Sequence, residues 1–241
     1  MTTSLWKMAA LCALLFVAGC ASKPAVPFDK SSASSIKTIG LLTPDVPSEP
    51  SAALASSPGQ SFGLIGALID AGIKEGRDSS LKKILDGQQF VADKAFTEGL
   101  TASLKARGYE VKLIPVSRED HGSLLKTYPS AKDNNVDAYL DVVAFYGYVA
   151  AGVAASTPYR PFLYTDCKLV KAEDGSVLMS DSVFYNPVLA AGGSTDHVTL
   201  APDPAYAFAS FDDLEADPVK AAKGESVAFA STTDAIGNLL R

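Results

Sequence analysis

Few side chains in this 241-residue sequence have the type and spacing that catalysis or metal binding requires. Its two histidines are 76 residues apart; His121 follows Glu119-Asp120, and His197 follows Asp196. A histidine flanked by carboxylates can bind zinc, but neither histidine belongs to a cluster with the spacing of zinc ligands. We therefore expect both histidines to be solvated loop residues.

Other chemical motifs are also missing from the sequence. The segment FDDLEAD (211–217) gathers four carboxylates but lacks the oxygen spacing and turn glycine of an EF-hand loop. A solvated helix start, with acids near the positive end of the helix dipole, explains it more simply. Nucleophile-elbow, phosphate-loop and dinucleotide-binding motifs are absent. The sequence therefore predicts a non-enzymatic protein with no catalytic, cofactor-binding or metal-binding residues.

The cysteine at position 20 is the residue with the clearest chemical context. Lys7 precedes an apolar run from Met8 to Gly19, and Cys20 ends it. The run is too short to span a bilayer as a helix. Its basic start, apolar centre and small final residues match a secretory signal peptide over residues 1–19. An ordinary secretory signal or a buried helix are the alternatives.

The end of this run, Val17-Ala18-Gly19-Cys20, resembles the lipobox of bacterial lipoproteins. This resemblance implies signal-peptide cleavage between Gly19 and Cys20, a diacylglycerol on the Cys20 thiol and an N-acyl chain such as palmitate on its amine. Two or more acyl chains anchor a protein stably to a membrane. In this class an Asp after the modified cysteine favours the inner membrane. Ala21 therefore implies a periplasm-facing anchor in the outer membrane.

Removal of residues 1–19 would leave 222 residues, enough for one substantial domain, and a net charge of about −7. Such a chain is not suited to binding nucleic acid. It would also leave Cys167 without a disulfide partner. In a strand, Cys167 would lie on the same face as Leu163 and Leu169, which predicts a thiol buried in the core. The alternative is a reactive thiol, but no neighbouring histidine or helix start favours it.

The chain after Cys20 divides into a tether and a single domain. Residues 20–35, rich in Ser and Pro, predict a flexible lipidated tether, and 36–241 predict one α/β domain with an insert at about 45–86. Residues 36–43 predict a strand, and 47–60 a loop. The run from Phe62 to Ile73, FGLIGALIDAGI, predicts a helix buried in the core or between two copies of the chain; membrane contact is the alternative.

The next segments alternate between helical and strand patterns. Apolar spacing predicts a helix over 87–107, and alternation predicts a strand over 109–116. A short helix is expected over 123–128. The apolar segment 136–153 predicts a central strand. Two alternating runs around Glu173-Asp174-Gly175-Ser176 predict a β-hairpin, and Asn186–Pro204 a long loop.

The last segment predicts an amphipathic helix that begins at Asp217-Pro218, with the acid as its cap. Gly224 should weaken this helix by about 1 kcal/mol relative to alanine. Its core-facing residues repeat at steps of three and four: Val219, Ala222, Ser226, Phe229, Thr233, Ile236 and Leu240.

Aromatic side chains are dense between positions 145 and 164, namely Phe145, Tyr146, Tyr148, Tyr159, Phe162 and Tyr164. Tyrosine and phenylalanine favour strands, so a structural role explains them. The alternative is a groove for a glycan or small ligand, formed with loop 186–204. That alternative would make the protein an envelope enzyme or a carrier.

The element order, with the segments VDAYLDVVAFYGY and CKLVKAEDGSVLMSD and an amphipathic C-terminal helix, resembles lipoproteins with a TolB-amino-domain-like fold, among them the curli-secretion lipoprotein family. The fold class is therefore α/β, an α+β sandwich with a mixed sheet and helices packed on one face. The resemblance implies a lipid-anchored binding or assembly module of the cell envelope. Its expected partners are the membrane and either envelope proteins or copies of itself.

Overall fold

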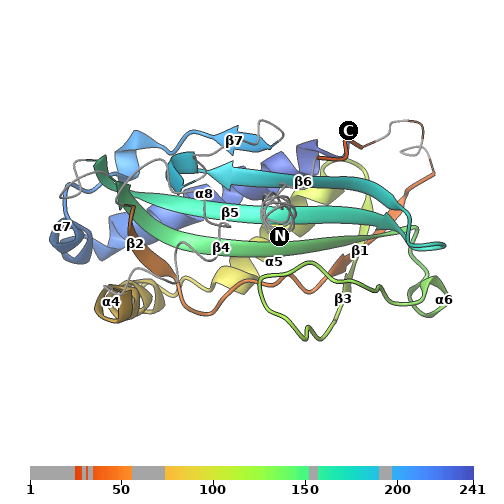
Figure 1. Cartoon of the computed structure of the whole chain (residues 1–241), viewed down its shortest axis with the longest axis horizontal. Helices are drawn as coiled ribbons and strands as arrows, with labels where there is room; N and C mark the ends of the chain where they lie inside the picture. Colours follow the sequence, from red (N-terminus) through yellow and green to blue (C-terminus); the bar gives the residue numbers. More distant parts are fainter. Residues whose placement is uncertain (1–24, 29–30, 32–34, 56–73, 152–156, 190–196) are drawn as a thin grey trace, which may run out of the picture.

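The structure is a computed structural model, and it describes residues 25–28, 31, 35–55, 74–151, 157–189 and 197–241. The described residues form a mixed seven-stranded sheet with helices packed on it, which confirms the predicted fold class (Figure 1). The strands are β1 (Thr38–Leu42), β2 (Ser51–Ala55), β3 (Glu110–Ile114), β4 (Ala138–Ala151), β5 (Thr157–Lys171), β6 (Val177–Tyr185) and β7 (Val198–Leu200).

The sheet order is β3-β1-β4-β5-β6-β7, and β2 also pairs with β4. β1 and β2 both run parallel to β4 along the same side, with a bridge between Asp45 and Val143 lying between them. β4, β5 and β6 are antiparallel neighbours, and β7 pairs parallel with β6. The two long strands β4 and β5 therefore form the centre of the sheet: β1 and β2 pair with β4, and β6 pairs with β5.

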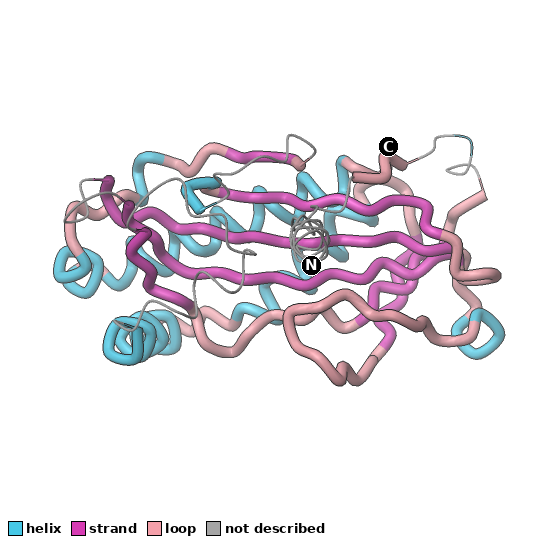
Figure 2. Tube along the Cα trace, viewed as in Figure 1, coloured by secondary structure: helices cyan, strands magenta, loops and turns pink. Residues whose placement is uncertain are grey.

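The helices are α4 (Lys74–Gly87), α5 (Ala92–Lys105), α6 (Ala131–Asn134), α7 (Phe211–Ala216) and α8 (Pro218–Asn238), with 3₁₀ turns at Pro187–Leu189 and Pro204–Tyr206. α5 and α8 lie together behind the sheet (Figure 2), and the main core is packed between these two layers. Phe229 of α8 makes edge-on ring contacts with Phe90, Phe96 and Tyr146, at centroid distances of 5.2–5.8 Å. None of the helices in the described ranges is long and apolar enough to cross a bilayer.

Strand β4 is buried on both faces, as its continuous apolar sequence predicts. Gly147 allows β2 to pair with it, because a Cβ there would collide with the backbone oxygen of Ser51, and its φ of +143° is one that L side chains rarely adopt. The β5–β6 hairpin also forms as predicted, with Gly175 in a left-handed conformation in the turn. The N-terminal cap of α8 is confirmed, since the Asp217 side chain accepts from the Lys220 amide at 3.0 Å.

Several element predictions are wrong. The predicted loop 47–60 contains strand β2, which finds its hydrogen-bond partners on β4. The single helix over 87–107 is interrupted between α4 and α5, where Gln89 has a φ of +58°. Residues 123–128 have no helical structure, and the short helix is α6, beyond Pro129. The predicted loop 186–204 contains β7 and one 3₁₀ turn among its described residues, and a second 3₁₀ turn begins at its last residue, Pro204.

The tether and the last helix also need correction. Val26, placed in the flexible tether, exchanges backbone hydrogen bonds with Ser180 of β6, and Phe28 packs in the main core. Val219 of α8, predicted to face the core, is 65% exposed. Gly224 was predicted to weaken the helix, but the packing requires a glycine here. A Cβ at this position would collide with the Tyr148 hydroxyl and lie 2.9 Å from the Tyr206 Cβ.

Candidate functional site

The loop of residues 116–129, hereafter the 116–129 loop, lies on the sheet face opposite the helices (Figure 1). It follows β3 and precedes α6. Its apolar side chains Val116, Leu125 and Tyr128 pack on a small cluster that includes Tyr139 and Val170. The loop thus packs on this part of the open face of the sheet through its own hydrophobic contacts.

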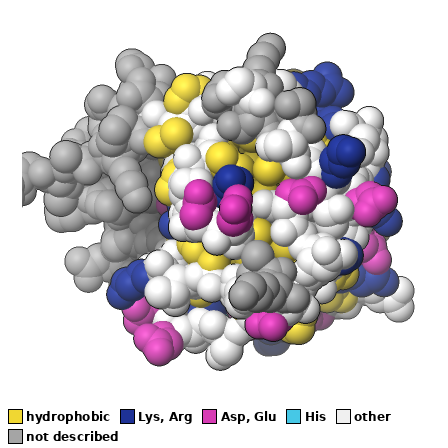
Figure 3. Space-filling view, turned by 90° about the vertical axis from the view of Figure 1, so that its right-hand side faces the viewer, with side chains coloured by type: hydrophobic (Ala, Val, Ile, Leu, Met, Phe, Trp, Pro, Cys, Tyr) yellow, Lys and Arg dark blue, Asp and Glu magenta, His cyan; other side chains and the backbone are white. Residues whose placement is uncertain are grey.

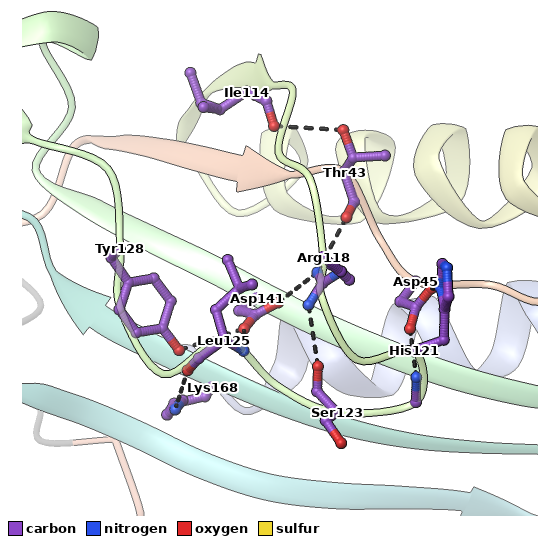
Figure 4. A network of polar contacts seen from close by, with 11 residues as sticks. Thr43, Asp45, Ile114, Arg118, His121, Ser123, Leu125, Tyr128, Asp141 and Lys168 are labelled. Atoms are coloured by element: carbon purple, nitrogen blue, oxygen red, sulfur yellow. Dashed lines mark hydrogen bonds and ion pairs between the residues drawn. The ribbon is translucent and has the colours of Figure 1, made fainter.

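A buried ion pair fixes the loop to the sheet. The Arg118 side chain is 5% exposed and that of Asp141 on β4 is fully buried, and their closest N–O distance is 2.6 Å. The guanidinium of Arg118 also donates to the backbone oxygens of Thr43 at 3.1 Å and Ser123 at 3.2 Å (Figure 4). These hydrogen bonds occupy both terminal nitrogens of Arg118, so its chemistry is to hold the loop in place.

The second oxygen of the Asp141 carboxylate binds the same loop further along. It accepts from the Leu125 amide at 2.7 Å and from the Tyr128 hydroxyl at 3.3 Å. Burial, and then the charge of Asp141, raise the pKa of Tyr128. Lys168 of β5 lies over the Tyr128 ring at 5.2 Å and donates to the Leu125 oxygen. The Asp141 carboxylate therefore binds the loop at three residues, Arg118, Leu125 and Tyr128.

A second carboxylate holds the tip of the loop. Asp45 accepts from Nδ1 of His121 at 2.8 Å and from the Gly122 amide. His121 itself is 86% exposed, whereas Asp45 is mostly buried. The imidazole is thus oriented by a fixed carboxylate with its other nitrogen free to face solvent. As predicted, His121 lies on the surface; its partner is Asp45, not the adjacent Glu119 or Asp120.

The loop encloses a cavity of about 400 Å³ whose lining comes from residues 116–129 alone. Its charged lining residues beside Arg118 are Glu119, Asp120 and Lys126, all exposed at the loop surface. Because Arg118 is buried and bound to Asp141, the charges that an approaching ligand would meet at the rim are those of Glu119, Asp120 and Lys126, which have both signs. This arrangement suits recognition of a polar surface more than covalent chemistry.

A second cavity, of about 270 Å³, lies between α4, the start of α5 and the segment before β2. Its apolar lining includes Val46, Phe90, Leu85 and Tyr146, and Lys82 and Asp86 form an ion pair at its rim. Tyr146 is the member of the aromatic group 145–164 that lines this cavity.

A fully buried carboxylic acid lies in the core beneath α8. Glu225 has no exposed surface, and neither of its side-chain oxygens has a hydrogen-bond partner in the described part of the chain. Burial raises the pKa of Glu225 well above its ordinary value. Burial, and then the Glu225 charge, also raise the pKa values of Tyr146 and Tyr148. This environment favours the protonated, neutral acid.

The other residues singled out by the sequence have different outcomes. Cys167 is buried as predicted, and burial raises the pKa of its thiol, which makes it unreactive. His197 was expected to be solvated, but it is half-buried against the Phe184 ring at 4.6 Å. Cys20, Gly19 and the segment from Phe62 to Ile73 lie outside the described residues. Within the described ranges, no group of metal-binding side chains is found.

The aromatic group does not form an open groove. Tyr146, Tyr148, Tyr159, Phe162 and Tyr164 are buried, and Phe145 is half-buried. Two of the tyrosine hydroxyls form hydrogen bonds inside the fold. The Tyr148 hydroxyl donates to the backbone oxygen of Ala221, and the Tyr164 hydroxyl donates to the backbone oxygen of Asn186. These side chains therefore serve mainly as core.

Sequence reasoning missed Asp141 and Glu225, although both carried a signal. Asp141 is a lone acid inside an apolar strand, VDAYLDVVAF, and a buried charge requires a partner. Glu225 lies three residues after Ala222 and four before Phe229, on the buried stripe of α8. Arg118, which binds Asp141, and Asp45, which binds His121, could not be found from spacing, because each lies in a segment without helix or strand periodicity.

Comparisons with solved structures show distant similarities of fold. No family model matches the sequence, and no curated protein matches it. Protein XCC0632 from Xanthomonas campestris, of family DUF330, aligns with a TM-score of 0.41 and 10% identity over 83% of this chain and 81% of that one. The hypothetical protein CT253 from Chlamydia trachomatis aligns with a TM-score of 0.35 and 9% identity, over 85% of this chain and 98% of that one. Similarity at this level carries no argument about the site.

Proposed function

We propose that this protein is a lipoprotein of the bacterial cell envelope, held at the periplasmic side of the outer membrane by acyl chains on Cys20. The observation that carries the proposal is the sequence Val17-Ala18-Gly19-Cys20 at the end of a signal-like apolar run. Ala21 after the cysteine supports the outer membrane. The TolB-amino-domain-like resemblance of the later segments is consistent with a periplasmic lipoprotein, and remains part of the proposal.

In this proposal the domain acts as a non-enzymatic binding or assembly module for an envelope protein or a second copy of itself. The 116–129 loop supports this role, because the buried Arg118–Asp141 pair and the Asp45 contacts fix its shape before any partner binds. A preorganised loop loses little conformational entropy on binding. Its exposed Glu119, Asp120 and Lys126 offer polar contacts of both signs.

The anchor is tested by comparing the natural sequence with Cys20→Ser in a Gram-negative host. The natural protein should stay in the membrane fraction after washing with high salt and with carbonate, and its mature N-terminal peptide should carry the mass of the acyl chains. Cys20→Ser should be released or retain its signal peptide, because the acceptor thiol is gone. An unmodified thiol on the mature natural protein would contradict the proposal.

The binding role is tested by placing a photo-crosslinking amino acid in the loop at Asp120 in living cells. A discrete crosslinked product is expected, with twice the mass of the protein for self-association or another defined mass for an envelope partner. The matched control is the same amino acid at the exposed Lys83 of α4. Equal yields of the same product from positions 120 and 83 would argue against a specific loop surface.

The alternative function is a carrier for a small apolar ligand. The cavity of about 270 Å³ at Tyr146 and Phe90 is the observation that favours it. This volume is slightly below the range of about 300–1,000 Å³ usual for ligand pockets. Co-purified lipids or metabolites, identified by mass spectrometry of the extracted native protein, would support this alternative over the binding module.

A further inference from the structure

The chain joins the folded domain earlier than its composition indicates. Val26 forms an antiparallel bridge with Ser180 on β6, with backbone N–O distances of 2.7 and 2.9 Å. Two residues later, Phe28 is buried in the main core. The residues from Val26 to Phe28 therefore belong to the domain and not to a tether.

This contact limits the length of any tether between Cys20 and the domain. Five residues, Ala21 to Ala25, separate Cys20 from Val26. A fully extended chain advances at most about 3.6 Å per residue, so Cys20 cannot lie further than about 22 Å from Val26. A tether reaching to Ser35, as the composition indicates, would allow more than about 50 Å.

The attachment point lies toward one end of an elongated molecule. Ser180 pairs with Lys168, near the C-terminal end of β5, on the side of the β5–β6 turn. Lys168 comes eleven positions after Thr157 at the start of β5, a distance of about 36 Å along the strand. The helices α4 and α7 lie at that far end, on the left in Figure 1, and the β5–β6 turn lies on the right.

The surface around the attachment point is compatible with the polar region of a lipid bilayer. Val26 and Val177, which lies about 10 Å from Ser180 along β6, are 39% and 45% exposed. Both are among the few large apolar side chains that the described residues leave on the surface. Figure 3 shows this end of the molecule, where apolar side chains lie between scattered acidic and basic ones.

We propose that the N-terminus holds the β6 edge, at the end bearing the β5–β6 turn, within about 22 Å of the membrane, so that α4 and α7 project away from the lipid surface. The inference rests on the proposed acylation of Cys20. It gives the anchored domain one preferred orientation, in which the far end is the part presented to the periplasm.

Energy transfer from single donor dyes to acceptor-labelled lipid headgroups tests this orientation. The natural, acylated full-length chain is used, with either Val177→Cys near the attachment point or Asp212→Cys on α7. Both positions are exposed, whereas Cys167 is buried and does not compete for the dye. The dye-labelled proteins are reconstituted into phosphatidylethanolamine–phosphatidylglycerol vesicles, and only protein that floats with the vesicles is measured.

The donor at position 177 should transfer more efficiently, with an apparent distance to the headgroups shorter by about 20 Å or more than from position 212. Insertion of twenty Gly/Ser residues between Lys23 and Pro24 should abolish most of this difference. Equal transfer from both positions in floating protein, or a difference that survives the insertion, would overturn the orientation alone. Protein that fails to float and carries no acyl chains would instead refute the proposed anchor.

Discussion

At the scale of single residues, Glu225 is a fully buried acid whose two carboxyl oxygens have no hydrogen-bond partner among the described residues. A buried carboxylate without hydrogen bonds costs much free energy, and the protein reduces this cost by keeping the acid protonated. The folded state then binds a proton that the unfolded chain releases near pH 4.5, its ordinary pKa. The contribution of this group is therefore fully present below about pH 4.5 and is lost as pH rises toward the raised folded pKa.

Replacement of Glu225 by Gln should remove this pH dependence. Near pH 4 the variant and the natural domain should have similar free energies of unfolding. Above pH 4.5 the natural domain should lose stability relative to the variant by up to about 1.4 kcal/mol per pH unit, until the pH passes the folded pKa. Urea unfolding between pH 4 and 8 measures both. A constant offset between the two proteins at every pH would show that Glu225 does not titrate in this range.

The Arg118–Asp141 pair is buried too, but its geometry differs from that of Glu225. Every polar contact of the Asp141 carboxylate comes from the 116–129 loop, so its ionised form is compensated where it lies. Such pairs contribute less to net stability than to a defined conformation, because desolvation offsets much of the attraction. We therefore regard this pair as the reason that the loop has one shape.

At the scale of elements, glycines show how tertiary packing overrides helix propensity. Gly76 of α4 has nothing within 4 Å of the place where a Cβ would lie, whereas a Cβ on Gly224 of α8 would collide with the Tyr148 hydroxyl. In an isolated helix an interior glycine is unfavourable by up to about 1 kcal/mol relative to alanine. The helix α8 needs its glycine because it lies directly on β4 and the Tyr206 turn.

Substitution of each glycine by alanine should therefore have opposite effects. Gly76→Ala should raise the free energy of unfolding by up to about 1 kcal/mol, through better helix propensity. Gly224→Ala should lower it by about 1–3 kcal/mol, because Tyr148 or Tyr206 must move. Thermal and urea unfolding of the two variants measure the difference. Stabilisation by both substitutions would mean that α8 can shift away from the sheet at little cost.

The elements that sequence reasoning found are those with strong local signals. β4 and β5 are long and β-prone, the hairpin turn contains Asp-Gly, and α8 begins with Asp-Pro. β2 was missed because its sequence, SAALA, has little strand propensity. Its conformation depends on two distant contacts: pairing with β4, and the Ala52 amide donating to Asp78 of α4 at 2.6 Å.

The candidate site was largely beyond such reasoning. Arg118, His121 and Tyr128 lie in a loop whose shape depends on carboxylates from β4 and from the segment between β1 and β2. No local pattern encodes these pairings. The predicted feature that remains most informative is Cys20, because the lipobox that it resembles is a short linear motif, and the proposed acylation depends on that motif and not on a fold.

At the scale of the whole molecule, the boundary between tether and domain depends on Phe28. Composition places the boundary near Ser35, whereas the Val26–Ser180 bridge and the burial of Phe28 place it near Ala25. The bridge alone contributes only two hydrogen bonds at an exposed edge of β6. The apolar contact of Phe28 with the core must therefore supply most of the free energy that keeps the segment docked.

Replacement of Phe28 by Ala should release this segment. The free energy of unfolding should fall by about 2–4 kcal/mol, because a nearly buried aromatic side chain is removed. The amides of Val26 and Ser180, which donate to each other's carbonyls, should lose protection from hydrogen exchange while the β4 and β5 amides keep theirs. Val26→Ala, which keeps Phe28 and the backbone bridge, is the matched control and should retain that protection. Unchanged protection of both amides in Phe28→Ala would contradict this prediction. It would show that contacts other than those of Phe28 keep the segment docked on β6.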